Sequence, residues 1–131
     1  MKIEISNGEL VDKLTILELK KVNINDVDKL DNIDNELSYL IEHFDSLKLE
    51  VERKVLKSLL FLKDKLFSVN QKLWGIEDDI REKEANKEFD ETFIELARSV
   101  YITNDERAYL KKEINLLTNS ILVEEKSYKE Y

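Results

Sequence analysis

The residues from 55 to 80 carry the feature that most limits how this chain can fold. Apolar side chains recur there at alternating spacings of four and three residues: Val55, Leu59, Leu62, Leu66, Val69, Leu73, Ile76 and Ile80. Side chains at this spacing fall on one face of an α-helix and form a heptad seam, as in a coiled coil. The pattern therefore predicts one long helix over about residues 49–85.

The composition favours helices in the rest of the chain as well. The sequence contains no proline and only two glycines, so its turns must be made mainly by Asn, Asp and Ser. A chain of 131 residues is long enough to bury the core of one domain. We therefore predict a single all-α domain over residues 1–131, a helical bundle of about five helices whose longest member is the heptad-patterned helix.

Two short motifs mark where further helices begin. Ser6 with Glu9 forms a capping box that satisfies free backbone N–H groups at a helix start, and Thr103 with Glu106 repeats the pattern. The apolar residues of the first helix point to more than one side, which predicts that several neighbours cover it. The expected helices span about residues 7–22, 26–44, 49–85, 90–102 and 103–121, with a turn at residues 86–88.

The charge and the residue content bear on function and location. The net charge of −8 disfavours binding to nucleic acid or to an anionic membrane, since both depend on Lys and Arg neutralising phosphates. No apolar run approaches the roughly 20 residues that span a bilayer. The absence of cysteine excludes thiolate chemistry and fits a reducing compartment, so we expect a cytoplasmic protein. The only histidine, His43, is expected at the surface.

The segment "LWGIEDDIREKE", residues 73–84, holds the only tryptophan and a run of charged residues. A helix that folds back after the predicted turn rises about 1.5 Å per residue beside the long helix, which puts Arg98 level with Asp78. Arg107 occupies a core position of the last helix, so its guanidinium is expected to point inward at a similar level. The candidate site residues that this arithmetic brings together are Trp74, Glu77, Asp78, Arg81, Arg98, Tyr101, Asp105 and Arg107.

Two interpretations of this cluster stay open. In the first, its arginines and carboxylates form a salt-bridge network that holds the helices together. In the second, the arginines bind a carboxylate or phosphate of a ligand, while the carboxylates orient them or hold a Mg²⁺ ion. No cofactor is evident, because the chain has no glycine-rich phosphate loop, zinc motif or haem motif, and Mg²⁺ stays an option.

The length of the heptad helix also bears on partners. This helix exceeds the first, fourth and fifth helices in length, so part of its seam is left over for a second copy or another protein. A homo-oligomer, a protein partner and a small phosphorylated ligand all stay open. Neither nucleic acid nor a membrane is expected.

Four segments carry a resemblance to known proteins: "GELVDKLTILELK", "LWGIEDDIREKE", "FIELARSVYITNDERAYLKKEIN" and "EEKSYKEY". In these segments the chain resembles an uncharacterised family of short bacterial and bacteriophage proteins, classed as a domain of unknown function. The resemblance implies no catalytic residues, because that family has no assigned activity. Its members are often encoded near glycosyltransferase and surface-polysaccharide genes, which implies a nucleotide-sugar or sugar-phosphate context.

The sequence thus supports two functional hypotheses and leaves open whether the chain is an enzyme. The leading one is a small soluble binding or interaction module. The alternative is a small enzyme or ligand-binding protein that acts on a phosphorylated or nucleotide-linked substrate, including a nucleotide sugar, at the Glu77, Arg98 and Arg107 cluster, with or without Mg²⁺.

Overall fold

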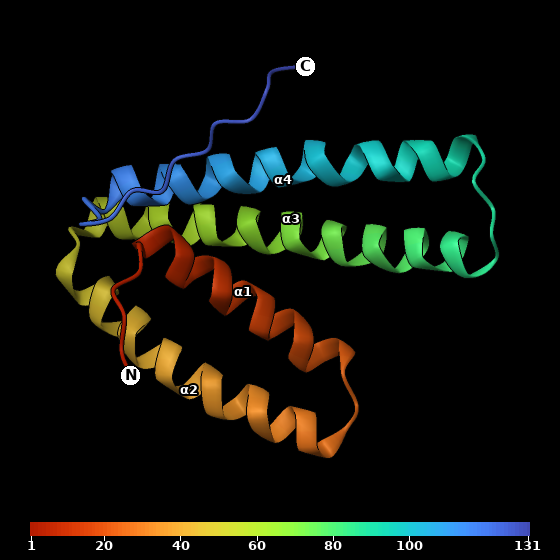
Figure 1. The fold of residues 1–131 in the computed structure, drawn as a ribbon. Helices are drawn as coiled ribbons and strands as arrows, with labels where there is room; N and C mark the ends of the chain where they lie inside the picture. The colour runs from red at the N-terminus through yellow and green to blue at the C-terminus, as the bar shows by residue number, and fades with distance from the viewer.

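Four helices build the protein in the computed structural model, which describes residues 1–131. They are α1 (Asn7–Asn23), α2 (Val27–Glu50), α3 (Arg53–Ala85) and α4 (Glu91–Leu117), and no strand is present. Figure 1 shows two antiparallel hairpins, α1 with α2 and α3 with α4, and a C-terminal tail that runs back along α4. The predicted all-α class is confirmed. None of the helices is long and apolar enough to cross a membrane.

The predicted number of about five helices is not confirmed, because residues 91–117 form one continuous helix. Thr103 lies inside α4 with its side chain fully buried, where the sequence predicted the cap of a fifth helix. The spacing of core positions explains the continuity. Val100, Thr103, Arg107 and Leu110 follow one another at intervals of three, four and three residues, so one helix face passes through the capping motif without a break.

The long helix α3 begins at Arg53, somewhat later than the predicted start near residue 49. The preceding helix reaches Glu50, and Val51 and Glu52 form the extended link between the two. Within the heptad seam, Leu59, Leu66 and Ile76 are buried, whereas the other five members are half-buried. The seam therefore faces the inside of the bundle, but only part of it is covered.

The turn between α3 and α4 lies where the sequence predicts it. Lys87 adopts a left-handed backbone conformation with φ of 54°, and the Glu88 N–H donates to the Lys83 carbonyl at 3.0 Å. This bonding pattern satisfies carbonyls at the end of α3 and reverses the chain. Asp90 then caps α4 by accepting a hydrogen bond from the Phe93 N–H at 3.0 Å.

Helix α1 lies between α2 and the α3–α4 hairpin (Figure 1), which explains why its apolar residues point to several sides. Its buried apolar side chains are Leu10, Val11, Leu14, Leu17 and Leu19. Full burial of one leucine contributes about 1.5–3 kcal/mol, so α1 supplies a large part of the core. The predicted cover on several sides is confirmed.

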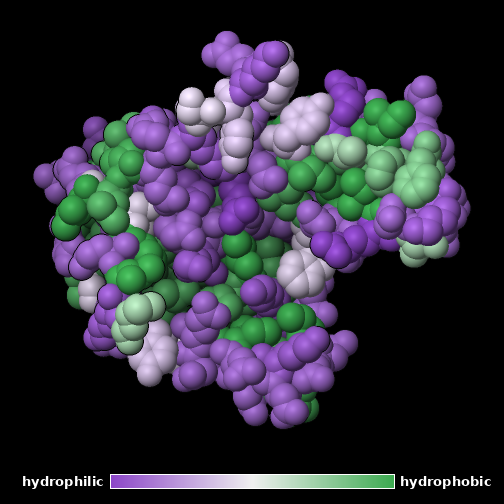
Figure 2. Space-filling view, in the orientation of Figure 1, coloured by the Kyte–Doolittle hydropathy of each residue, from purple (hydrophilic) through white to green (hydrophobic).

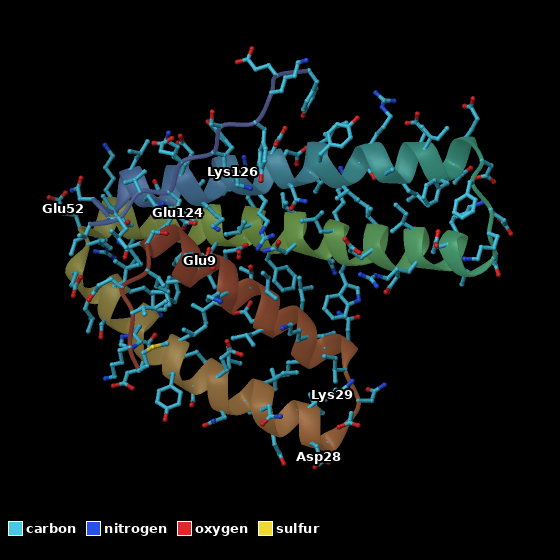
Figure 3. All side chains as sticks on the ribbon, viewed as in Figure 1. Glu9, Asp28, Lys29, Glu52, Glu124 and Lys126 are labelled. Atoms are coloured by element: carbon cyan, nitrogen blue, oxygen red, sulfur yellow. The ribbon has the colours of Figure 1, made fainter.

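Polar contacts fix the start of α1 against the end of α4. The Gly8 N–H donates to Asn115 Oδ1 at 2.6 Å, and a side chain at Gly8 would collide with the Lys111 carbonyl oxygen. The Lys111 ammonium binds Glu9 at 2.5 Å and lies 3.9 Å from Glu124 of the tail. In Figure 3, Glu9 and Glu124 accordingly lie on neighbouring segments beside α4. Two hairpins and the tail thus meet at one end of the bundle.

Candidate functional site

A buried carboxylate joins three helices in the middle of the fold. Asp12 of α1 has no exposed surface, and Arg107 of α4 donates to it from Nε at 2.9 Å and from Nη2 at 2.5 Å. Asn70 of α3 donates from Nδ2 to Asp12 Oδ1 and to Thr15 Oγ1, each at 2.9 Å. A buried charge is tolerated only when it is paired and hydrogen-bonded, and these contacts supply both. We call Asp12, Thr15, Asn70 and Arg107 the polar lock.

A cleft of about 470 Å³ opens beside the polar lock, between α1 and the α3–α4 hairpin. Its apolar walls are Ile16 and Leu19 of α1 and Leu73 and Trp74 of α3, and its polar groups are Asn70, Glu77, Asp78, Arg81, Asn104 and Arg107. This volume is typical of sites that bind small molecules. The combination of an aromatic wall with several amide and charged groups suits a ligand that is flat and polar.

Two members of the polar lock that line this cleft keep hydrogen-bonding atoms without a protein partner. Arg107 gives two of its nitrogens to Asp12, and its third, Nη1, donates to no protein group. Asn70 gives its Nδ2 to Asp12 and Thr15, and its Oδ1 accepts from no protein group. Hydrogen bonding to Asp12 raises the pKa of the Arg107 guanidinium, although burial acts in the opposite direction. The cleft is therefore lined by two side chains that Asp12 holds in place, one with a free donor and one with a free acceptor.

Five of the eight candidate residues predicted from the sequence line this cleft: Trp74, Glu77, Asp78, Arg81 and Arg107. Glu77 accepts a hydrogen bond from Arg81 Nε at 3.2 Å, an exposed pair one helical turn apart. The guanidinium of Arg107 points inward, toward a carboxylate of α1 that the prediction did not include.

The other three candidate residues lie outside the cleft. Arg98 is exposed and donates to Glu95 at 3.0 Å on the same helix. Tyr101 and Asp105 contact the C-terminal tail instead. The ring of Tyr131 packs edge-on against Tyr101 with centroids 5.4 Å apart, and its hydroxyl donates to Asp105 Oδ2 at 2.6 Å. The eight residues therefore form two separate groups on different sides of α4.

The sequence prediction missed the residues that organise the site, namely Asp12, Thr15, Asn70 and Asn104. One signal of buried polar residues was present in the sequence. Asp12 and Thr15 are polar residues in a helix that was already expected to be covered by neighbours on several sides. A carboxylate in such a helix needs a buried cationic partner. Asn104 gave no such signal, since the motif that contains it is typical of a helix start.

The acidic groups of the cleft do not form a ready-made metal site. Glu77 and Asp78 are its two carboxylates, and nowhere in the chain do three or more His, Cys, Asp or Glu side chains come together to hold a metal ion. A Mg²⁺ ion bound here would therefore take its remaining ligands from water or from a bound molecule, as is usual for Mg²⁺.

One family model matches residues 1–131. The chain belongs to a family of unknown function, DUF6165. No match was found among curated proteins, and none among solved structures. For this DUF6165 member, the geometry of its own side chains is therefore what indicates a function.

Proposed function

We propose that the chain is a small binding module and that the cleft beside the polar lock binds a flat, polar small molecule. One observation carries the proposal: Arg107 Nη1 and Asn70 Oδ1 have no protein partner, yet Asp12 holds both side chains in place at the cleft. Hydrogen-bonding groups that are fixed in advance lose little entropy when a ligand binds.

The side chains of the cleft favour a nucleotide-linked molecule as the ligand. A nucleobase is flat enough to stack on Trp74, and its edge offers both an acceptor for Arg107 and a donor for Asn70. The carboxylates of Glu77 and Asp78 repel a phosphate group unless Arg81 or a Mg²⁺ ion neutralises it. We therefore expect nucleosides, nucleotides and nucleotide sugars to differ in their dependence on Mg²⁺.

A thermal-shift screen tests the proposal with nucleosides, nucleotides, nucleotide sugars and sugar phosphates, each with and without Mg²⁺. A ligand at about one hundred times its dissociation constant adds roughly 2.7 kcal/mol to the free energy of unfolding, which raises Tm by several degrees. Because Trp74 is the only tryptophan, its fluorescence reports occupation of the cleft in a second, independent titration.

Matched variants connect any ligand to the cleft. Arg107→Lys keeps a cation beside Asp12 but lacks the additional nitrogen of the guanidinium, so it is expected to abolish the ligand-induced shift. Asn104→Ala is expected to weaken it. Arg98→Ala is the control, because Arg98 is exposed and lies outside the cleft. Equal loss in all three variants, or a shift that Arg107→Lys leaves unchanged, would contradict the proposal.

The rival proposal is a small enzyme that acts on a phosphorylated or nucleotide-linked substrate in the same cleft, with or without Mg²⁺. The presence of two neighbouring carboxylates, Glu77 and Asp78, favours it, because carboxylates serve as general bases or as Mg²⁺ ligands. Incubation with each ligand that binds, followed by phosphorus NMR, separates the two proposals. Product formation that Glu77→Gln abolishes while binding persists supports the enzyme, and recovery of unchanged ligand supports the binding module.

A further inference from the structure

We call the outer part of the α3–α4 hairpin, residues 73–101, the tip: its first turns on α3 line the cleft beside α1, and the rest extends beyond α1. Under α1, the apolar residues Leu59, Leu66 and Ile114 of the same two helices are 0% exposed. Within the tip only Ile76 is buried, whereas Phe89 and Ile94 are 56% and 53% exposed. One pair of helices is therefore covered along one half and uncovered along the other.

The uncovered residues continue the surface on which α1 lies. On α3, Leu73 and Ile80 follow the buried Leu66 at intervals of seven residues, and on α4, Val100 and Phe93 precede Arg107 at the same interval. Residues seven apart lie on the same face of a helix. We call the half-buried residues Leu73, Ile80, Phe93, Ala97 and Val100 the tip face. Figure 2 shows apolar side chains gathered over this projecting part of the hairpin.

The tip is also strongly acidic. It contains nine Asp and Glu residues against four Lys and Arg residues, so it carries −5 of the net charge of −8. Each of the four cations is already paired with a carboxylate of the tip itself. Four further carboxylates take part in no ion pair: Asp78, Asp79, Glu82 and Glu91. The tip therefore combines an uncovered apolar surface with unneutralised negative charge.

The position of two glutamates relative to the polar lock indicates what would complement this surface. Glu77 and Glu84 follow Asn70 at intervals of seven residues, on the side of α3 that faces α1. At Asn70, helix α1 supplies Asp12 and Thr15 to the side-chain amide. Beyond Asn70 this side of α3 therefore stays acidic, and together with the unpaired carboxylates of the tip it favours a positively charged neighbour.

We propose that the tip face is a docking surface for an amphipathic helix of a partner protein, with an apolar stripe and Lys or Arg residues beside it. Helix α1 already packs on the same surface in this way, through buried leucines and charged pairs. The part of α3 within the tip, residues 73–85, spans 13 residues, so a docked helix of roughly 14 residues would lie along it and border the cleft. A second copy of this chain fits less well, because two tips in contact bring together two segments of charge −5.

Fluorescence anisotropy with designed peptides tests this proposal. The probe is an 18-residue helical peptide of Leu and Lys with a leucine stripe, and its two controls are a Leu/Glu peptide with the same stripe and a scrambled Leu/Lys peptide. The expected result is that the amphipathic Leu/Lys peptide binds at least about ten-fold more tightly than either control and that added salt weakens its binding.

Two double variants with the same change in net charge locate the binding site. Glu84→Lys/Ala97→Lys alters the tip, and Glu36→Lys/Leu116→Lys alters exposed positions elsewhere. None of the four positions lines the cleft, so this test is independent of the ligand proposal. The tip variant is expected to lose at least about ten-fold in affinity and the control less than about two-fold. If the tip variant fails to fold, Glu84→Lys alone replaces it, because that side chain is 58% exposed.

Three results would overturn the proposal. Equal losses in the two double variants would mean that the peptide responds only to net charge. Equal binding of the amphipathic and scrambled peptides would mean that no apolar stripe is recognised. A dimer detected by light scattering that Ala97→Lys converts to a monomer would assign the tip face to a second copy.

Discussion

The carboxylate of Asp12 is completely buried, and the guanidinium of Arg107 binds both of its oxygens from a helix 95 residues later in the chain. This pair joins α1 to the α3–α4 hairpin. It also holds in place Arg107, which lines the cleft. The contact that stabilises the fold and the contact that orients the candidate site are therefore the same.

Removing one member of this pair is expected to be costly. Arg107→Ala leaves the Asp12 carboxylate buried without its cation, and the loss of one partner of a buried ion pair lowers the free energy of unfolding by about 3–5 kcal/mol. Arg98→Ala is the control, because an exposed pair such as the one with Glu95 contributes little to stability. Urea denaturation followed by circular dichroism measures both. Equal and small losses would show that Asp12 is not confined as the structure places it.

The two glycines of the chain are expected to respond in opposite directions to alanine. At Gly8 a Cβ would collide with the backbone carbonyl of Lys111, which cannot move without shifting α4, so Gly8→Ala costs about 1–3 kcal/mol. At Gly75 nothing lies within 4 Å of a new Cβ, so Gly75→Ala stabilises α3 by about 1 kcal/mol. Thermal unfolding of both variants checks the signs. A destabilising Gly75→Ala would indicate a contact at this position that the isolated chain lacks.

The relation between sequence and structure is clearest at the α3–α4 hairpin. Counting residues from the predicted turn placed Arg98 level with Asp78. The structure has nearly the same register, because Asn70 of α3 and Arg107 of α4 lie level with each other and both bind Asp12. The height of a residue along the hairpin was thus predictable, because the rise per residue of a helix is constant. The side of the helix was not predictable, since Arg98 and Asp105 lie outside the cleft once residues 91–117 form one helix instead of two.

The polar lock shows why the rest could not be predicted from local patterns. Asp12 and Arg107 come together only because α1 crosses the hairpin, and no spacing within either helix encodes that crossing. Thr103 illustrates the opposite error, in which a local motif predicted a helix start that tertiary packing overrides. The heptad seam of α3 predicted a long helix correctly, but which half of the seam is covered depends on where α1 diverges.

Two buried threonines, Thr15 of the polar lock and Thr103 one turn before Arg107, are expected to behave differently when replaced by valine. The Thr103 hydroxyl is buried and has no hydrogen-bond partner, so Thr103→Val removes an unsatisfied group and raises the free energy of unfolding by about 1 kcal/mol or more. The Thr15 hydroxyl donates to the Asp12 carbonyl at 2.8 Å and accepts from Asn70. Thr15→Val is therefore expected to cost about 1–3 kcal/mol. Urea denaturation compares the two variants, and a loss at Thr103 would indicate an unseen partner for its hydroxyl.

The attachment of the C-terminal tail to α4 is expected to depend on pH at the alkaline end. The hydrogen bond from the Tyr131 hydroxyl to Asp105, with a smaller effect of burial, raises the pKa of Tyr131 above its ordinary value near 10.0. A group whose pKa is raised by folding stabilises the folded form below its unfolded pKa and loses that contribution as pH rises through the folded pKa.

The tail should therefore stay on α4 through neutral pH and detach when Tyr131 ionises, because a phenolate beside the Asp105 carboxylate is repelled. A near-ultraviolet absorbance titration should show a tyrosine ionisation above the ordinary range, and both Tyr131→Phe and Asp105→Asn should remove this step. Its absence in the unmodified chain would show that the tail does not hold this contact in solution.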